Sequence, residues 1–171
     1  MTAVTVSPKF QVVIPKEIRE ALGIFSGQKV QMLTYQNRIE IIPLKPMREM
    51  RGFLKGINTN IERDQDRVWP ESHMNVVDSS AWLSYFAGDK NAHAFAAAIE
   101  NLDELLVPSI TLTEVFKHVL CQRDEESALA AIAHMQQGKV IPLNAELAID
   151  AGNYGVIHKF PLADSIIYAT S

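Results

Sequence analysis

"MNVVDSSAWLSYF" (residues 74–86) lies in the middle of a chain of 171 residues, yet it reads like the beginning of a protein. A methionine precedes a short apolar run of the type that forms a buried strand, and this run ends in Asp78. The stretch therefore predicts that a second folded part begins at Met74. It also places an aspartate where a strand should end.

Beyond this stretch, strand-like and helix-like segments alternate along the chain. Apolar runs typical of strands occupy 75–78, 104–109 and 139–143. Helical patterns occupy 81–86, 91–102, 112–120, 125–138, 144–160 and 162–171. Strands joined by crossover helices predict a parallel sheet with helices on both faces, whose working residues collect at the strands' carboxyl ends.

The residues before Met74 have a different, mostly strand-like pattern. Short β-branched runs at 3–7 and 10–15 predict strands, a helix is expected from Lys16 to a closing Gly23, and 29–44 reads as two strands around a Gln36-Asn37 turn. About fifty residues of this kind are too few to close a core alone. We therefore expect this part to dimerise, with two copies sharing one interior.

Residues 47–73 join the two patterns and cannot build a core of their own. The apolar residues are interrupted by two glycines, and a charged stretch follows. Such a segment is expected to fold by lying on another part of the molecule, although a plain linker is the alternative. The apolar residues are Met47, Met50, Phe53, Leu54 and Ile57.

The net charge of the chain changes sign between the residues before Met74 and those from Met74 onward. Residues 1–73 carry 11 basic and 8 acidic side chains, a balance of +3, whereas residues 74–171 carry 5 and 12, a balance of −7. Opposite net charges speed and orient association. The asymmetry indicates different partners for the two halves, or halves that bind each other.

The composition also indicates in which cellular compartment the protein is expected. No apolar run approaches the length of a membrane span, and the amino terminus lacks a basic-then-apolar signal segment. The single cysteine, Cys121, permits neither an internal disulfide nor a cysteine-based zinc cluster. We therefore expect a cytoplasmic protein.

Three carboxylates stand at or near the starts of helices in the second half: Asp78, Glu114 and Asp164. If they converge, their mutual repulsion requires a divalent cation, and oxygen ligands favour Mg²⁺ or Mn²⁺. Such a site would support phosphoryl-ester hydrolysis. Taken singly, the two aspartates could instead be helix caps and Glu114 a solvated helix residue. The histidines show no ligand pairing that would indicate other metal chemistry.

At these residues a resemblance becomes visible. "NVVDSSAWLSYF", "VPSITLTEVFKHVL" and "PLADSIIYATS" resemble, in this order, the first three acidic motifs of the PIN domain family, specifically the VapC-type toxins. The resemblance covers nearly all of 74–171. It implies an α/β endoribonuclease fold in which Asp78, Glu114 and Asp164 bind Mg²⁺ (or Mn²⁺) and act on RNA. Ser79 or Ser80 and Thr113 would be polar neighbours of these acids.

The first half is similar to another family. "SPKFQVVIPKEIREALGIFSGQKVQMLTYQNRIEIIPL" resembles the AbrB or MazE-like swapped-hairpin DNA-binding domain of VapB antitoxins. For residues 1–46 this implies a dimeric β-barrel that binds operator DNA, with the cations on phosphates and base edges. The implied DNA-binding residues are Lys9, Gln11, Lys16 and Arg19. Scattered surface charges are the alternative.

Residues 47–73 then resemble the antitoxin tail that wraps its toxin. A basic side chain of this tail could enter the acidic site, pair with a carboxylate and exclude metal by replacing its charge. The candidates for this inhibitory role are Lys55, Arg63 and Arg67, with one of the two arginines favoured.

The second half departs from the family at its end. PIN domains usually continue past the third acidic motif with a strand, a fourth acid and a last strand, whereas this sequence ends at Ser171. We therefore expect the 74–171 domain to be incomplete at its C-terminus, and destabilised, swapped or completed by another chain. Its activity is expected to be inhibited or impaired.

Three functions follow from these patterns. The leading one is a toxin–antitoxin fusion, in which a dimeric DNA-binding antitoxin part neutralises a Mg²⁺-dependent endoribonuclease part in cis or in trans and represses its own promoter. The second is a DNA-binding regulator whose degenerate, non-catalytic PIN half serves only in assembly. The third is a sheet protein that binds a partner or ligand in an acidic cleft.

Overall fold

The computed structural model describes residues 3–60 and 75–171. The chain forms two compact units, Met1–Leu44 and Lys45–Ser171. The segment 45–60 therefore belongs to the same unit as the second half of the chain.

The first unit is built from one helix and one hairpin. Helix α1 spans Lys16–Leu22 and ends at Gly23, as its sequence indicates. Strands β1 (Val30–Tyr35) and β2 (Arg38–Pro43) pair antiparallel. The two turn residues, Gln36 and Asn37, have φ values of 44° and 63°, which is the left-handed conformation that a tight two-residue hairpin turn requires. The predicted hairpin is therefore confirmed.

The strands expected at 3–7 and 10–15 are not formed. The chain turns between them, with the Phe10 amide donating to the Ser7 carbonyl and the Ser7 amide donating to the Gln11 carbonyl, each at 2.9 Å. A strand needs a hydrogen-bonded neighbour, and β1–β2 is the only strand pair within residues 3–44. In a single chain, this unit therefore forms only a two-stranded sheet within residues 3–44. The swapped β-barrel that was expected for it stays a prediction.

Residues 3–44 do not bury a core. None of their side chains is buried, and several large apolar ones are largely exposed: Phe10 at 91%, Val13 at 79% and Ile39 at 69%. Exposed apolar side chains of this density are typical of an association surface.

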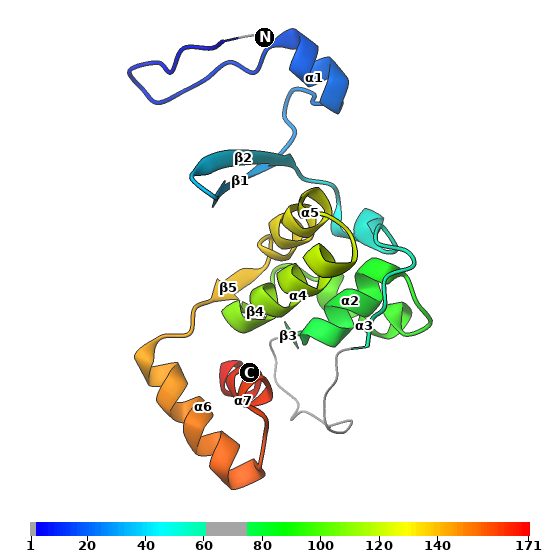
Figure 1. Cartoon of the computed structure of the whole chain (residues 1–171), viewed down its shortest axis with the longest axis vertical. Coiled ribbons are helices and arrows are strands. Elements are labelled where there is room, and N and C mark those ends of the chain that lie inside the picture. Colours follow the sequence, from blue (N-terminus) through cyan, green and yellow to red (C-terminus); the bar gives the residue numbers. More distant parts are fainter. Residues whose placement is uncertain (1–2, 61–74) are drawn as a thin grey trace. The chain divides into compact units, whose positions relative to one another are not determined.

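The second unit contains a parallel sheet (Figure 1). Strands β3 (Asn75–Val76), β4 (Leu105–Pro108) and β5 (Lys139–Ile141) lie in the order β3-β4-β5, and both pairings are parallel. This confirms the predicted parallel sheet. All four residues of β4 are buried, as expected for the central strand.

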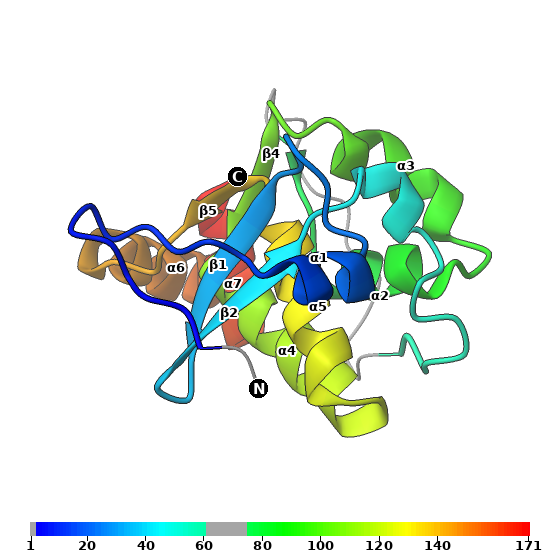
Figure 2. The same ribbon diagram turned by 90° about the horizontal axis from the view of Figure 1, so that it is seen from above.

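Helices connect the strands of this sheet and follow the last of them in the chain. They are α2 (Ser79–Ala87), α3 (Ala92–Glu100), α4 (Ser109–Gln122), α5 (Glu125–Met135), α6 (Ala145–His158) and α7 (Leu162–Thr170). Helix α4 packs on α5 and α6 packs on α7, and both α4 and α7 contact β4 (Figures 1 and 2). Trp82, Tyr85 and Phe86 of α2 are completely buried, which makes α2 the centre of the core.

The segment 45–60 lies on these helices. After the 3-10 helix η1 (Met47–Met50), the chain continues without regular structure. Four of its apolar side chains are at most 8% exposed and join the same hydrophobic core: Met47, Met50, Leu54 and Ile57. This part of the predicted tail therefore folds against the second half, as expected, and is not a plain linker.

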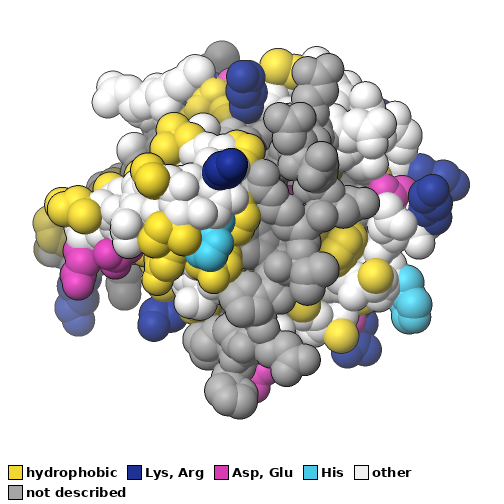
Figure 3. Space-filling view, turned by 90° about the horizontal axis from the view of Figure 1, so that it is seen from below, with side chains coloured by type: hydrophobic (Ala, Val, Ile, Leu, Met, Phe, Trp, Pro, Cys, Tyr) yellow, Lys and Arg dark blue, Asp and Glu magenta, His cyan; other side chains and the backbone are white. Residues whose placement is uncertain are grey.

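Helices α6 and α7 are held together by aromatic side chains. Tyr154 and His158 of α6 contact Tyr168 of α7, with ring centroids 5.0 and 5.4 Å away. The outer side of α6 leaves Ile149, Val156 and Ile157 at least 60% exposed. Seen from below, apolar side chains gather over this helix (Figure 3).

Within the described ranges, no helix has both the length and the apolar character needed to cross a membrane.

Candidate active site

Asp78 lies two residues after β3, at the carboxyl end of that strand. Its Oδ1 accepts a hydrogen bond from the Ser79 amide at 2.5 Å, so Asp78 caps α2. Its other oxygen, Oδ2, accepts from the Ser80 hydroxyl at 2.7 Å. Asp78 therefore has the helix-capping role that the sequence offered as an alternative, and this hydrogen bond fixes the orientation of its carboxylate.

Ser79 links Asp78 to Glu114. The buried Ser79 Oγ lies 2.8 Å from Glu114 Oε2 and 3.2 Å from Asp78 Oδ1. Helix α4 begins directly after β4, which brings Glu114 in its second turn to the same edge of the sheet. Two carboxylates from different strand-to-helix connections thus meet at one hydroxyl.

Asp164 occupies the first turn of α7 and is 5% exposed. Because α7 packs on β4 and α4, this carboxylate lies on an element that contacts the helix of Glu114. In residues 3–60 and 75–171, no three His, Cys, Asp or Glu side chains are arranged to hold a metal ion. The carboxylate oxygens are nevertheless the donor type that Mg²⁺ and Mn²⁺ prefer, so the donor chemistry fits such an ion.

The polar neighbour Thr113 has a different position. Its side chain is exposed, and its hydroxyl donates to the Ser109 carbonyl one turn earlier at 3.4 Å. Of the polar neighbours that the resemblance implied, Ser79 and Ser80 are the ones that hydrogen-bond to the carboxylates directly.

The four residues predicted to bind DNA are all exposed. The backbone amides of Lys9 and Gln11 both donate to Ser7 Oγ, which places these two residues at one turn. Lys16 pairs with Glu20 at 3.6 Å on α1, and Arg19 Nε donates to the Ile14 carbonyl at 3.0 Å.

The Lys55 backbone lies beside the carboxyl end of α4. Its carbonyl accepts a hydrogen bond from Arg123, which follows the last residue of α4. Arg123 comes nine residues after Glu114, and at 1.5 Å per residue this is about 13 Å along the helix. Arg63 and Arg67 lie outside the described residues.

From Lys55 the segment runs along the carboxyl-terminal half of α4. The Asn58 amide donates to Gln122 Oε1 at 2.7 Å, and the Asn58 carbonyl lies 2.5 Å from His118 Nε2. Thr59 Oγ1 donates to Asp89 Oδ2 at 3.0 Å. No local sequence pattern indicates these polar contacts, because their partners stand 30 to 64 residues apart in the chain.

The start of the segment is anchored by a buried histidine. The Lys45 amide donates to His134 Nε2 at 3.1 Å, which makes Nε2 the acceptor and leaves the proton on Nδ1, 2.7 Å from the Ala130 carbonyl. Burial lowers the pKa of His134 below its ordinary value; the hydrogen bond to the Ala130 carbonyl works against this effect, and the nearby Lys45 charge adds to it.

Comparison with known families agrees with this geometry. The family model described as PIN domain matches residues 76–171, which contain all three acids, and the chain therefore belongs to the PIN domain family. The model described as antidote-toxin recognition MazE, bacterial antitoxin, matches residues 3–49. The predicted fusion of an antitoxin part with a PIN part is thus confirmed. PIN domains are in general nucleases. No curated protein and no solved structure matched the chain.

Proposed function

We propose that the chain is a fused toxin–antitoxin pair of the VapB–VapC type. Its PIN part is a Mg²⁺- or Mn²⁺-dependent endoribonuclease, and the segment docked on it is the toxin-binding part of the antitoxin. The observation that carries the nuclease proposal is the meeting of Asp78 and Glu114 at Ser79 Oγ.

The chemistry follows from the residues. Asp78, Glu114 and Asp164 would hold the cation, which would supply an activated water and neutralise charge on the phosphate. Ser80 fixes one Asp78 oxygen, and the Ser79 hydroxyl joins Asp78 to Glu114, so that two acids are oriented before RNA arrives.

Restraint would come from the tail. The described part of the tail, up to Asn60, is held on α2 and α4, and the sequence continues into the stretch that carries Arg63 and Arg67. Arginine suits this role because its planar guanidinium can pair with a carboxylate through two hydrogen bonds. Lys55, which sits beside the far end of α4, is the weaker candidate.

The first unit would bind operator DNA as a homodimer and repress the promoter of its own gene. The support is physical: residues 3–44 bury nothing in one chain, while Lys9, Gln11, Lys16 and Arg19 are exposed. A second copy would cover the apolar side chains and present two sets of basic residues to the two halves of a palindromic site.

RNA cleavage tests the nuclease proposal. The full chain and its Arg63→Ala/Arg67→Ala variant are incubated with single-stranded and structured RNA and Mg²⁺ or Mn²⁺. We expect cleavage to rise at least tenfold in the double variant and to vanish when Asp78→Asn is added. Lys55→Ala should change it little.

The matched control is Asp150→Asn, which removes an exposed carboxylate of α6. Equal loss in both Asn variants, or no cleavage by any variant, would contradict the proposal.

One observation favours a second candidate. Because the described residues bring no three potential ligands together around one ion, the PIN half could serve in assembly while the first unit regulates transcription. Operator binding without any RNA cleavage, in all of the variants above, is the result that this alternative requires.

A further inference from the structure

The surface at the carboxyl end of α2 makes unusually close contact with the docked segment. Leu54 donates its backbone amide to the Phe86 carbonyl at 2.8 Å, and Gly52 donates to the Tyr85 carbonyl at 3.1 Å. Carbonyls of the last helical turn lack the regular helical partner, so the segment provides a donor to the Phe86 carbonyl and a second donor to the Tyr85 carbonyl, which the Gly88 amide also reaches at 3.1 Å. This contact joins backbone to backbone.

Two glycines make the approach possible. Gly88 ends α2 with a φ of 65°, and a Cβ added to it would lie 2.8 Å from Gly52 Cα and 3.3 Å from Gly52 N. Real Cβ atoms essentially never come that close to backbone, and the backbone here cannot rotate away as a side chain would. Gly52 itself has a φ of 80°, which disfavours other residues. A Cβ added to Gly52 would lie 3.7 Å from Gly88 Cα, which is ordinary contact, so the close approach requires a glycine at position 88, while the backbone conformation favours a glycine at position 52.

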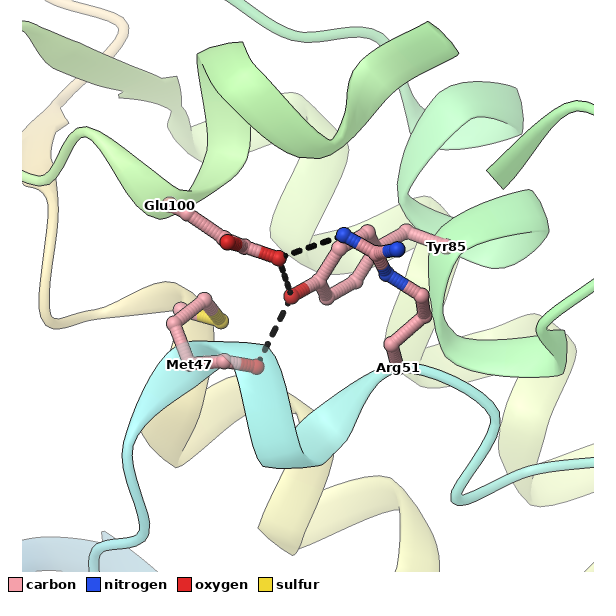
Figure 4. A network of polar contacts seen from close by, with 4 residues as sticks. All are labelled: Met47, Arg51, Tyr85 and Glu100. Carbon is pink, nitrogen blue, oxygen red and sulfur yellow. Dashed lines mark hydrogen bonds and ion pairs between the residues drawn. The ribbon is translucent and has the colours of Figure 1, made fainter. Parts of the chain in front are cut away.

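The residue before Gly52, Arg51, forms a charged pair with Glu100 (Figure 4). Arg51 Nη2 of the segment donates to Glu100 Oε1 of α3 at 2.7 Å, and its guanidinium lies over the Tyr85 ring, 5.5 Å from the centroid. The Tyr85 hydroxyl, with a single proton, lies 2.9 Å from both Glu100 Oε1 and the Met47 carbonyl.

Through this network the surface is complementary to the segment in charge as well as in shape. Burial works to raise the pKa of Glu100, but the hydrogen bonds from Arg51 and Tyr85 and the Arg51 charge bring it below its ordinary value. Glu100 is therefore ionised and presents a fixed negative charge to the residue before Gly52. The apolar contacts of the segment lack this selectivity, because any well-sized apolar side chain can fill such positions.

We infer that the surface formed by Tyr85, Gly88 and Glu100 is a recognition site for an Arg-Gly pair, and that this site decides which antitoxin segment the PIN part accepts. The occupant is the chain's own Arg51-Gly52. The inference rests on the proposed function in treating 45–60 as the toxin-binding segment. It is tested by binding alone, so that absence of nuclease activity would leave it standing.

The test uses the full chain with a protease site inserted within 61–73. After cleavage, the release of residues 1–60 from the PIN part is followed by size-exclusion chromatography against an excess of labelled peptide 45–60. We expect Gly88→Ala to release the segment at least tenfold faster. Gly23→Ala is the matched control, because Gly23 has the same φ of 65° and open space around it.

Charge exchange provides a test that leaves the backbone untouched. Arg51→Glu and Glu100→Arg should each speed release at least tenfold, and the double variant should restore most of the retention. Thermal unfolding of the uncleaved variants checks that each one folds. Unchanged release in Gly88→Ala, or no recovery in the folded double variant, would overturn the inference.

Discussion

The two units of this chain solve the problem of burying apolar surface in opposite ways. Residues 3–44 leave every side chain at least partly exposed, whereas the second unit buries a continuous core that includes Trp82, Tyr85 and Phe86 completely. The second unit also recruits residues 45–60 into that core. The comparison teaches that the boundary between self-sufficient and partner-dependent folding falls within the antitoxin part, near Lys45.

The largest expected effect tests whether the docked segment is truly part of the core. Leu54 is 2% exposed, and its replacement in Leu54→Ala should lower the free energy of unfolding of the second unit by about 2 to 5 kcal/mol. Chemical denaturation of the full chain measures this. Leu162→Ala removes a leucine of the same unit that is 77% exposed and should cost no more than about 0.5 kcal/mol. Similar losses in both would place the segment outside the core.

The next effect concerns the partner that the first unit lacks. Ile39 of β2 is 69% exposed, and we expect a second chain to cover it. Ile39→Asp should then raise the dissociation constant of the homodimer about a hundredfold, because a carboxylate would be buried at the interface. Analytical ultracentrifugation over a range of concentrations measures it. Ile157→Asp, at a comparably exposed position of the second unit, is the control, and an equal effect of both would refute this interface.

The smallest effect concerns pH at the boundary between the units. The folded chain keeps His134 neutral because its pKa is lowered, while the unfolded chain takes up a proton below about pH 6.5. Stability of the second unit therefore falls as the pH drops below this value. Protonation would also abolish the acceptor that Nε2 offers to Lys45.

Unfolding midpoints at pH 7.5 and 5.5 measure this effect. His134→Gln should flatten the difference between the two, whereas His93→Gln, which changes an exposed histidine, should keep it. A steep response that survives in His134→Gln would assign the effect to another group.

Local patterns in the sequence predicted local structure well. The Gln36-Asn37 turn, the end of α1 at Gly23 and the three parallel strands all follow from residues close in sequence. The strands expected at 3–7 and 10–15 failed for a nonlocal reason, since their pairing requires neighbours that residues 3–44 of one chain do not offer.

The candidate site also has some features that local sequence patterns predict and others that they do not. The sequence placed Asp78 and Glu114 at the starts of helices, and their types indicated a metal. It could not show that Ser79 Oγ joins them across 35 residues, nor that Gly88 would meet Gly52. Such distances depend on how helices pack, and no local pattern encodes them. The DNA-binding and metal-binding roles stay predictions.

The position of the docked segment in the chain determines when it is synthesised relative to the surface that it covers. A ribosome makes residues 45–60 before it makes α2, α3 and α4, so the covering segment is already present when the surface that it covers emerges. Because both are one polypeptide, they are also made in equal number. The chain thus supplies one covering segment for each PIN part, whatever the rate at which it is synthesised.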